Sequence, residues 1–126
     1  MKIMIVDDSK IIRGKITQII RSFEAEDFSI TGIAKNGLEA IDLCKKTMPD
    51  LVTMDLTMPQ LDGVSTISEL VKINPDVLIL VVSALADKAT ALEALKRGAH
   101  GFICKPFTEE QLQDALNEMI SEGIDS

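Results

Sequence analysis

Three aspartates, one serine and one lysine carry groups suited to phosphoryl and metal chemistry, and each follows a short apolar run: Asp7 and Asp8, Asp55, Ser83 and Lys105. If these runs are parallel strands of one sheet, their carboxyl ends meet at one edge, where such sheets bind ligands. Any one of these residues alone could be a helix cap or a solvated side chain. Together they predict a functional site, because four strand ends would carry one coherent set of groups.

The three carboxylates predict a bound cation. Carboxylates about 5 Å apart repel one another by roughly 3 kcal/mol per pair at an effective dielectric constant of about 20. Oxygen ligands select a hard ion, and Mg²⁺ uses one or two carboxylates while keeping positions for water and for a phosphate oxygen. We therefore expect Mg²⁺ among Asp7, Asp8 and Asp55.

Asp55 is the expected nucleophile, because it stands alone on the central run while Asp7 and Asp8 are better placed to hold the metal. A carboxylate is ionised at neutral pH and can form an aspartyl phosphate. In-line phosphoryl transfer spreads negative charge over three oxygens. The metal, the Lys105 ammonium and the Ser83 hydroxyl are the groups expected to stabilise that charge.

The elements that position these residues follow from the apolar pattern. Five runs rich in β-branched residues alternate with amphipathic segments, which is typical of βαβ units around a parallel sheet. The predicted strands are Lys2–Val6, Ser29–Ala34, Leu51–Met54, Val77–Val82 and Gly101–Cys104. The intervening segments carry apolar stripes at helical spacing, among them Leu92 with Leu95, and each stripe is expected to face the core.

Helix boundaries are also marked in the sequence. Thr108 and Gln111 form a capping-box pattern before the last apolar stripe. Gly98 and Gly123 each follow a stripe, where a glycine commonly ends a helix. The sequence therefore predicts five strand and helix pairs in an α/β fold.

Length and charge limit the classes of protein. The chain has 126 residues, 46% of them hydrophobic, with 13 Lys and Arg against 20 Asp and Glu and a net charge of −7. This predicts one domain over residues 1–126 with a single core and without an output domain. The acidic balance argues against nucleic acid or an anionic membrane as the principal partner.

The cysteines and the lengths of the apolar runs indicate the cellular compartment of the protein. Cys44 and Cys104 lie inside apolar runs and are expected to be small core residues, not a disulfide framework. No signal peptide is recognised at the start, and no apolar run approaches the roughly 20 residues of a membrane helix. We expect a cytoplasmic protein that does not span a membrane.

Several motifs together carry a resemblance to a known family. They are I-V-D-D-S at 5–9, A-K-N-G-L-E-A at 34–40, P-D-L-V-T-M-D-L-T-M-P at 49–59 with D-G at 62–63, S-A at 83–84 and G-A-H-G-F-I-C-K-P-F at 98–107. Over nearly its whole length the chain resembles the receiver domain of two-component response regulators, most of all the single-domain chemotaxis (CheY-like) type. The resemblance implies a flavodoxin-like, doubly wound sheet of five parallel strands in the order 2-1-3-4-5, with helices on both faces.

The resemblance implies roles for the acids. Asp55 matches the phosphoacceptor of the family, and Asp7 and Asp8 match the acid pair that holds Mg²⁺. The backbone carbonyl of Thr57 matches a further metal ligand.

It also implies roles for three residues on the later strands. Ser83 matches the hydroxyl that turns toward the phosphoryl group, and Lys105 matches the ammonium that pairs with that group. Phe102 matches the aromatic switch, whose ring moves inward when the hydroxyl moves. A cis peptide bond commonly precedes the proline that matches Pro106.

The partners implied by the resemblance are a sensor histidine kinase as phosphodonor, a downstream protein and a phosphatase, with chemotaxis as the suggested pathway. The downstream protein would read the surface of the fourth helix, fifth strand and fifth helix of a monomer. The resemblance implies that the protein is not a conventional enzyme, although a receiver catalyses its own phosphorylation. Thr57 and Leu85 match positions beside the path of the hydrolytic water, and neither orients water well, which predicts slow autodephosphorylation.

Three other functions share parts of this pattern. An aspartyl-phosphate hydrolase of the haloacid dehalogenase type needs a second Asp two residues after its nucleophile, but Ser9 follows Asp7 and Thr57 follows Asp55 at that spacing. A flavin-binding relative would need a phosphate loop and stacking aromatics, and the chain has no Trp or Tyr. A phosphorylation-independent adaptor is the remaining alternative, and the complete acid, hydroxyl and lysine set argues against it.

Overall fold

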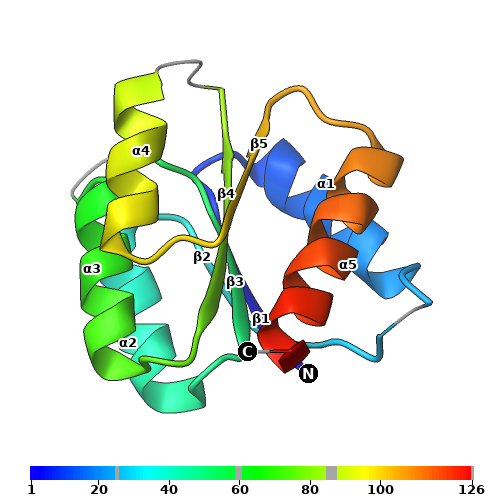
Figure 1. Cartoon of the computed structure of the whole chain (residues 1–126), viewed down its shortest axis with the longest axis horizontal. Coiled ribbons are helices and arrows are strands. Elements are labelled where there is room, and N and C mark those ends of the chain that lie inside the picture. The colour runs from blue at the N-terminus through cyan, green and yellow to red at the C-terminus, as the bar shows by residue number, and fades with distance from the viewer. Residues whose placement is uncertain (25, 59–60, 85–87, 126) are drawn as a thin grey trace.

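The computed structural model describes residues 1–24, 26–58, 61–84 and 88–125, without the side chains of residues 88 and 123–125. In this part of the chain, strands and helices alternate (Figure 1). They are β1 (Lys2–Val6), α1 (Lys10–Arg21), β2 (Ser29–Ala34), α2 (Gly37–Thr47), β3 (Leu51–Met54), α3 (Gly63–Ile73), β4 (Leu78–Ser83), α4 (Lys88–Arg97), β5 (Gly101–Cys104) and α5 (Glu109–Asp125).

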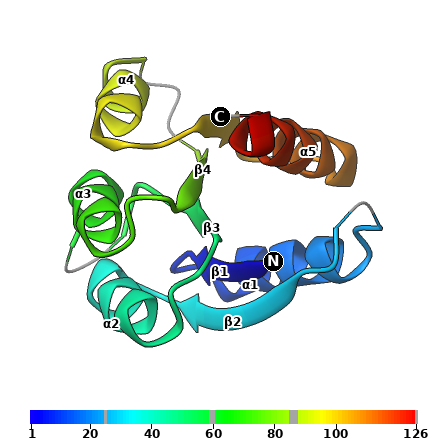
Figure 2. The same cartoon turned by 60° about the horizontal axis from the view of Figure 1, so that its bottom comes forward.

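The strands form one parallel sheet in the order β2-β1-β3-β4-β5. Figure 2 shows this sheet between two layers of helices. The order confirms the predicted flavodoxin-like fold. It places β1 and β3 next to each other at the centre, so the residues that follow these two strands are neighbours.

Alternate residues of the buried strands face two cores. One core, beneath α2, α3 and α4, includes Val6, Met54, Val81 and Leu70. The other, beneath α1 and α5, includes Ile5, Ile16 and Leu116. The near-continuous apolar sequences of β1, β3 and β4 follow from this arrangement, because both faces of a doubly wound sheet are covered.

Four helix starts are fixed by side chains that accept a backbone N–H three residues later. The accepting residues are Ser9, Asn36, Asp62 and Thr108. At the last of these, Gln111 Oε1 accepts the Thr108 N–H at 2.9 Å, which completes the predicted capping box. The start of α5, just after Lys105, is therefore fixed locally.

Two predicted boundaries are wrong. The fourth strand begins at Leu78 and ends at Ser83, one residue later than predicted. The Val77 N–H bonds to the Asn74 carbonyl in a turn, while Ser83 pairs with Cys104 and its carbonyl accepts from the Lys105 N–H. The last helix runs through Gly123 to Asp125, since a glycine inside a helix costs only about 1 kcal/mol. Gly98, in contrast, does follow α4, with a φ of 124°.

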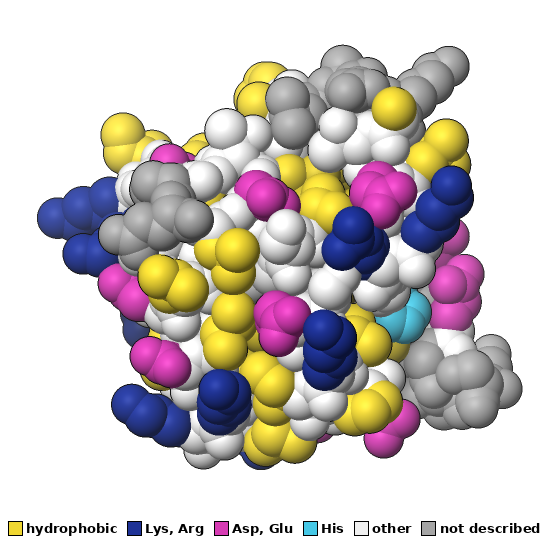
Figure 3. Space-filling model, turned by 90° about the vertical axis from the view of Figure 1, so that its left-hand side faces the viewer, with side chains coloured by type: hydrophobic (Ala, Val, Ile, Leu, Met, Phe, Trp, Pro, Cys, Tyr) yellow, Lys and Arg dark blue, Asp and Glu magenta, His cyan; other side chains and the backbone are white. Residues whose placement is uncertain are grey.

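Two expectations about burial are also wrong. Cys44 is buried as predicted, but Cys104 is exposed, because it ends an edge strand. Leu92 and Leu95 are 58% and 44% exposed, and it is Ala94 that α4 buries. Figure 3 shows hydrophobic side chains at the surface among charged ones on the side formed by α2, α3 and α4.

A search of the described residues finds no helix that is long and apolar enough to cross a membrane.

Candidate functional site

Backbone hydrogen bonds place three of the expected site residues at one edge of the sheet. The hydrogen-bonded ladder continues one residue beyond the strands: the Asp7 N–H bonds to the Ala34 carbonyl, and the Asp55 N–H bonds to the Val6 carbonyl, both at 3.0 Å. Lys105 is held in the same way by its bond to the Ser83 carbonyl, at 2.9 Å. Their side chains are therefore positioned by the sheet more than by flexible loops.

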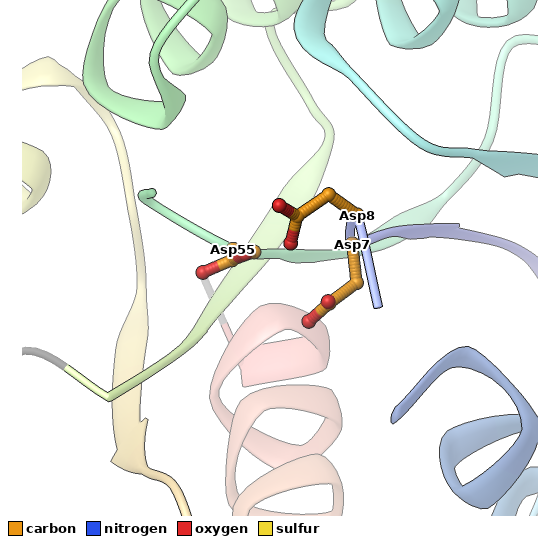
Figure 4. Close-up of side chains that lie close together, drawn as sticks. All are labelled: Asp7, Asp8 and Asp55. Atoms are coloured by element: carbon orange, nitrogen blue, oxygen red, sulfur yellow. The ribbon is translucent and has the colours of Figure 1, made fainter. Parts of the chain in front are cut away.

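The acids meet as predicted. Oxygens of Asp7, Asp8 and Asp55 all lie within 4.8 Å of one another. Figure 4 shows Asp7 and Asp8 at the end of β1 beside Asp55 at the end of β3. Asp7 and Asp55 are 1% and 3% exposed, whereas Asp8 is open to solvent. The cluster thus combines two buried carboxyls with one that is accessible from outside.

Lys105 reaches into this cluster. Its Nζ lies 2.7 Å from Asp7 Oδ2, an ion-pair contact outside good hydrogen-bond geometry, and 3.7 Å from Asp55 Oδ1. The other Asp7 oxygen, Oδ1, accepts the Ser9 N–H at 2.9 Å. One ammonium therefore bridges the two buried carboxylates, which lowers their mutual repulsion without a metal.

Asp55 still has a perturbed acidity. Burial, followed by the negative charge of Asp7, raises the pKa of Asp55 to about 6. Lys105 and the Thr57 N–H, which bonds to Asp55 Oδ1 at 3.3 Å, act in the opposite direction, and Asp8 adds to the rise. At neutral pH the Asp55 carboxyl is mostly ionised, as a nucleophile must be. It becomes protonated once the pH falls below about 6.

The raised pKa of Asp55 predicts how stability changes with pH. The folded protein binds this proton more tightly than the unfolded chain does, so the contribution of Asp55 favours folding at low pH and is lost as the pH rises through about 6. Relative to Asp55→Asn, the wild-type free energy of unfolding should fall by about 2 kcal/mol between pH 4.5 and 7.5. Urea unfolding of both proteins in metal-free buffer measures this. Parallel pH curves would contradict the assigned pKa.

Other predicted residues lie on the strands β4 and β5 and in the loop after β3. Ser83 is fully buried at the end of β4, and Phe102 on β5 is half-buried against the core under α2, α3 and α4. Thr57 is exposed, and its N–H contacts Asp55. The peptide bond between Lys105 and Pro106 is cis. Leu85 lies outside the described residues.

Two residues that sequence reasoning missed support the acids. The Arg13 guanidinium donates to the Asp7 carbonyl at 2.9 Å, across six residues of chain. A Cβ on Gly63 would collide with the Asp55 carbonyl and the Leu56 Cα, so only glycine lets α3 start against the Asp55 loop. The D-G motif could have revealed Gly63, but no sequence pattern identifies Arg13, whose contact depends on how α1 sits over β1.

The cluster fits a magnesium ion. Its candidate ligands are all carboxylate oxygens, one side is solvent-exposed, and Mg²⁺ needs only one or two carboxylates because it retains waters. The repulsion that raises the pKa of Asp55 is the interaction that a bound cation would relieve. Asp7, Asp8 and Asp55 are therefore the residues that could hold the ion.

A chain with this sheet and this acid cluster can be compared with known proteins, and it belongs to the response regulator receiver family, whose domain model, "Response regulator receiver domain", matches residues 3–117. The chain is 40% identical over 118 residues to the chemotaxis protein CheY of Thermotoga maritima, which covers 94% of this chain and 96% of that protein. CheY of Bacillus subtilis is 34% identical over 120 residues, with 95% and 98% covered. It is thus a CheY-like receiver domain.

Solved structures agree with the fold. The response regulator domain of Thermotoga maritima CheB is 33% identical and superposes with a TM-score of 0.85, covering 100% of this chain and 97% of that one. A chain of the CheX-CheY-BeF3-Mg²⁺ complex from Borrelia burgdorferi is 30% identical with a TM-score of 0.88, covering 94% and 88%.

Proposed function

We propose that the protein is a phosphoacceptor that takes a phosphoryl group from a sensor histidine kinase onto Asp55 and then presents an altered surface to a partner protein. One observation carries this proposal: a buried carboxyl at the end of the central strand lies among two further acids and an ammonium. Such a constellation suits phosphoryl transfer, in which negative charge accumulates beside the acceptor.

The proposed step forms one bond and breaks one. An ionised Asp55 oxygen attacks the phosphorus of a phosphohistidine, the P–N bond breaks, and the imidazole leaves with the bonding electrons. The sheet holds the Asp55 backbone, and the Thr57 N–H fixes the oxygen Oδ1. Lys105, 3.7 Å from that oxygen, is close enough to move onto the new phosphoryl oxygens. The buried Ser83 hydroxyl is the second group proposed to contact them.

Asp7, Asp8, Asp55 and the carbonyl of Thr57 are the residues proposed to hold Mg²⁺. When bound, the ion neutralises charge on the acceptor and on the transferred group. Lys105 alone cannot balance three acids, which supports a requirement for the ion.

The proposed output surface is the face formed by α4, β5 and α5. The exposure of Leu92 and Leu95 on α4 supports it, because exposed apolar side chains suit a protein partner. The partially buried ring of Phe102 lies on the strand of the same face and is the proposed switch. Phosphorylation would shift an existing equilibrium of this face.

The other expectations remain proposals. Relatives matched along 96% and 98% of their own length support a single receiver domain over residues 1–126 and a place in chemotaxis. A phosphatase as a further partner, a monomeric state, a cytoplasmic location and slow autodephosphorylation through Thr57 and Leu85 are likewise predictions, as is the absence of nucleic acid and membrane partners.

A direct labelling experiment tests the proposed function. With Mg²⁺ and a small phosphodonor such as acetyl phosphate, the intact protein should gain the mass of one phosphoryl group. An excess of chelator should reduce labelling by at least about tenfold, since the acids would then repel the donor. A protein that gains no phosphoryl group with Mg²⁺ would favour the phosphorylation-independent adaptor. The hydrolase alternative does not fit the family to which the chain belongs.

The metal proposal predicts opposite effects of one substitution with and without the ion. Asp8→Ala removes an exposed carboxylate that repels Asp55, so the metal-free variant should melt at a higher temperature than the wild type. It should bind Mg²⁺ at least about tenfold more weakly, because even indirect metal contacts are worth that much. Thermal melts with and without Mg²⁺ measure both effects. A variant that is less stable without metal, yet equally stabilised by Mg²⁺, would contradict this account.

A further inference from the structure

A lysine on α1 forms a hydrogen bond to the loop that carries Lys105. The Lys15 Nζ donates a hydrogen bond to the Phe107 carbonyl at 2.5 Å and lies 4.4 Å from the centroid of the Phe107 ring. These residues are 92 positions apart in the chain. One ammonium thus holds both the backbone and the side chain of Phe107, two residues after Lys105.

The loop between β5 and α5 has two other fixed points. At its start the Lys105 N–H bonds to the Ser83 carbonyl, and at its end the capping box holds Thr108. Phe107 lies between them and is only 3% exposed, with its ring in the core under α1 and α5. The contact with Lys15 therefore ties the middle of this loop to α1.

The same helix also holds the opposite side of the acid pocket. Arg13, two residues before Lys15, donates to the Asp7 carbonyl. Through these two side chains α1 contacts the backbone that carries Asp7 and the backbone that carries Lys105. The side chains of Asp7 and Lys105 meet at 2.7 Å.

We propose that Lys15 is a positioning residue that holds the Lys105 ammonium against Asp7 and Asp55 by fixing the carbonyl and ring of Phe107. It touches none of the reacting atoms itself. This proposal rests on the proposed function, because the position of the Lys105 ammonium matters when a phosphoryl group is transferred to Asp55. In that case α1 is the element that determines this position. The contact between Lys15 and Phe107 can nevertheless be tested in the unphosphorylated protein.

The test is the coupling free energy between Lys105 and Asp7, measured by a double-mutant cycle of urea unfolding in metal-free buffer. The cycle uses Lys105→Met, Asp7→Asn and the double variant, first with Lys15 present and then with Lys15→Met, which keeps the hydrocarbon chain. The coupling should fall by at least about half when Lys15 is replaced and should return with Lys15→Arg. A merely structural contact would lower stability equally in all four proteins and leave the coupling unchanged, which would overturn the proposal.

A second readout needs only the Lys15 variants. In the wild type, the ¹⁵N resonance of the Lys105 ammonium should show slow proton exchange, as expected for a held ion pair, and in Lys15→Met that protection should be lost. Ser22→Ala is the matched control, since it removes another hydrogen bond to the start of α5, from the C-cap residue of α1 to Glu109, and should leave the resonance unchanged. An unaltered Lys105 resonance in Lys15→Met would refute the positioning role. Failure of the wild type to accept phosphate would refute the proposed function alone.

Discussion

Asp55→Asn should gain no phosphoryl group under conditions that label the wild-type protein fully. The amide has nearly the same shape as the carboxyl, but its oxygen is not an ionised nucleophile. The other two acids of the cluster are less suited to replace it: Asp7 is ion-paired with Lys105 and accepts the Ser9 N–H, and Asp8 is exposed to solvent and follows β1, not the central strand. The expected effect is a loss of at least about a thousandfold in labelling rate, as for the removal of other nucleophiles.

The variant is also expected to remain folded. Replacing a buried carboxyl that has a raised pKa removes a source of repulsion, so Asp55→Asn should be at least as stable as the wild type at neutral pH. Asp62→Asn is a matched control, because Asp62 is an exposed aspartate in the same β3-to-α3 connection, where asparagine also caps a helix well. Intact-mass spectrometry after incubation with Mg²⁺ and acetyl phosphate compares the three proteins. Full labelling of Asp55→Asn would show that the acceptor is misassigned.

Lys105→Ala should accept phosphate yet fail to change its surface. The ammonium bridges Asp7 and Asp55 before phosphorylation and is proposed to turn to the phosphoryl oxygens afterwards. A hydrogen bond to a charged group contributes about 1.5–3 kcal/mol, which corresponds to roughly a 10- to 150-fold change in the ratio of active to inactive conformations. Without Lys105 most of the phosphorylated protein should therefore keep its resting conformation.

NMR chemical shifts around Phe102, recorded before and after phosphorylation, measure this response. Removal of Lys105 also raises the pKa of Asp55 further, so labelling is best done near pH 8, where the carboxyl is ionised in both proteins. Lys46→Ala, on the exposed end of α2, is a control for the loss of one positive charge. A wild-type shift response in Lys105→Ala would exclude the coupling role.

Much of the architecture could be predicted from local sequence, because it depends on local periodicity. The bounds of β1, β2, β3 and β5 agree with the apolar runs, and the parallel order brings Asp7, Asp8 and Asp55 together as expected. Strand ends meet at one edge in any sheet of this kind, so no knowledge of side-chain packing was needed.

The rest depended on tertiary geometry. The stripe of Leu92 and Leu95 has helical spacing, but α4 covers the end of the sheet next to an edge strand, and both leucines are left exposed. The ion pair between Lys105 and Asp7 joins residues 98 positions apart in the chain. The contact between Lys15 and Phe107 depends on how α1 packs against the sheet. No local sequence pattern predicts either contact.

Locating the phosphoryl group in the chain tests whether Asp55 is the acceptor. The wild-type protein is phosphorylated with Mg²⁺ and acetyl phosphate, the acyl phosphate is trapped by reduction with borohydride, and the proteolytic peptides are sequenced by mass spectrometry. The aspartate at position 55 should be converted to homoserine, with Asp7 and Asp8 unmodified. Reduction at Asp7 or Asp8, or a stable phosphate on Ser83 with Asp55 intact, would contradict this assignment.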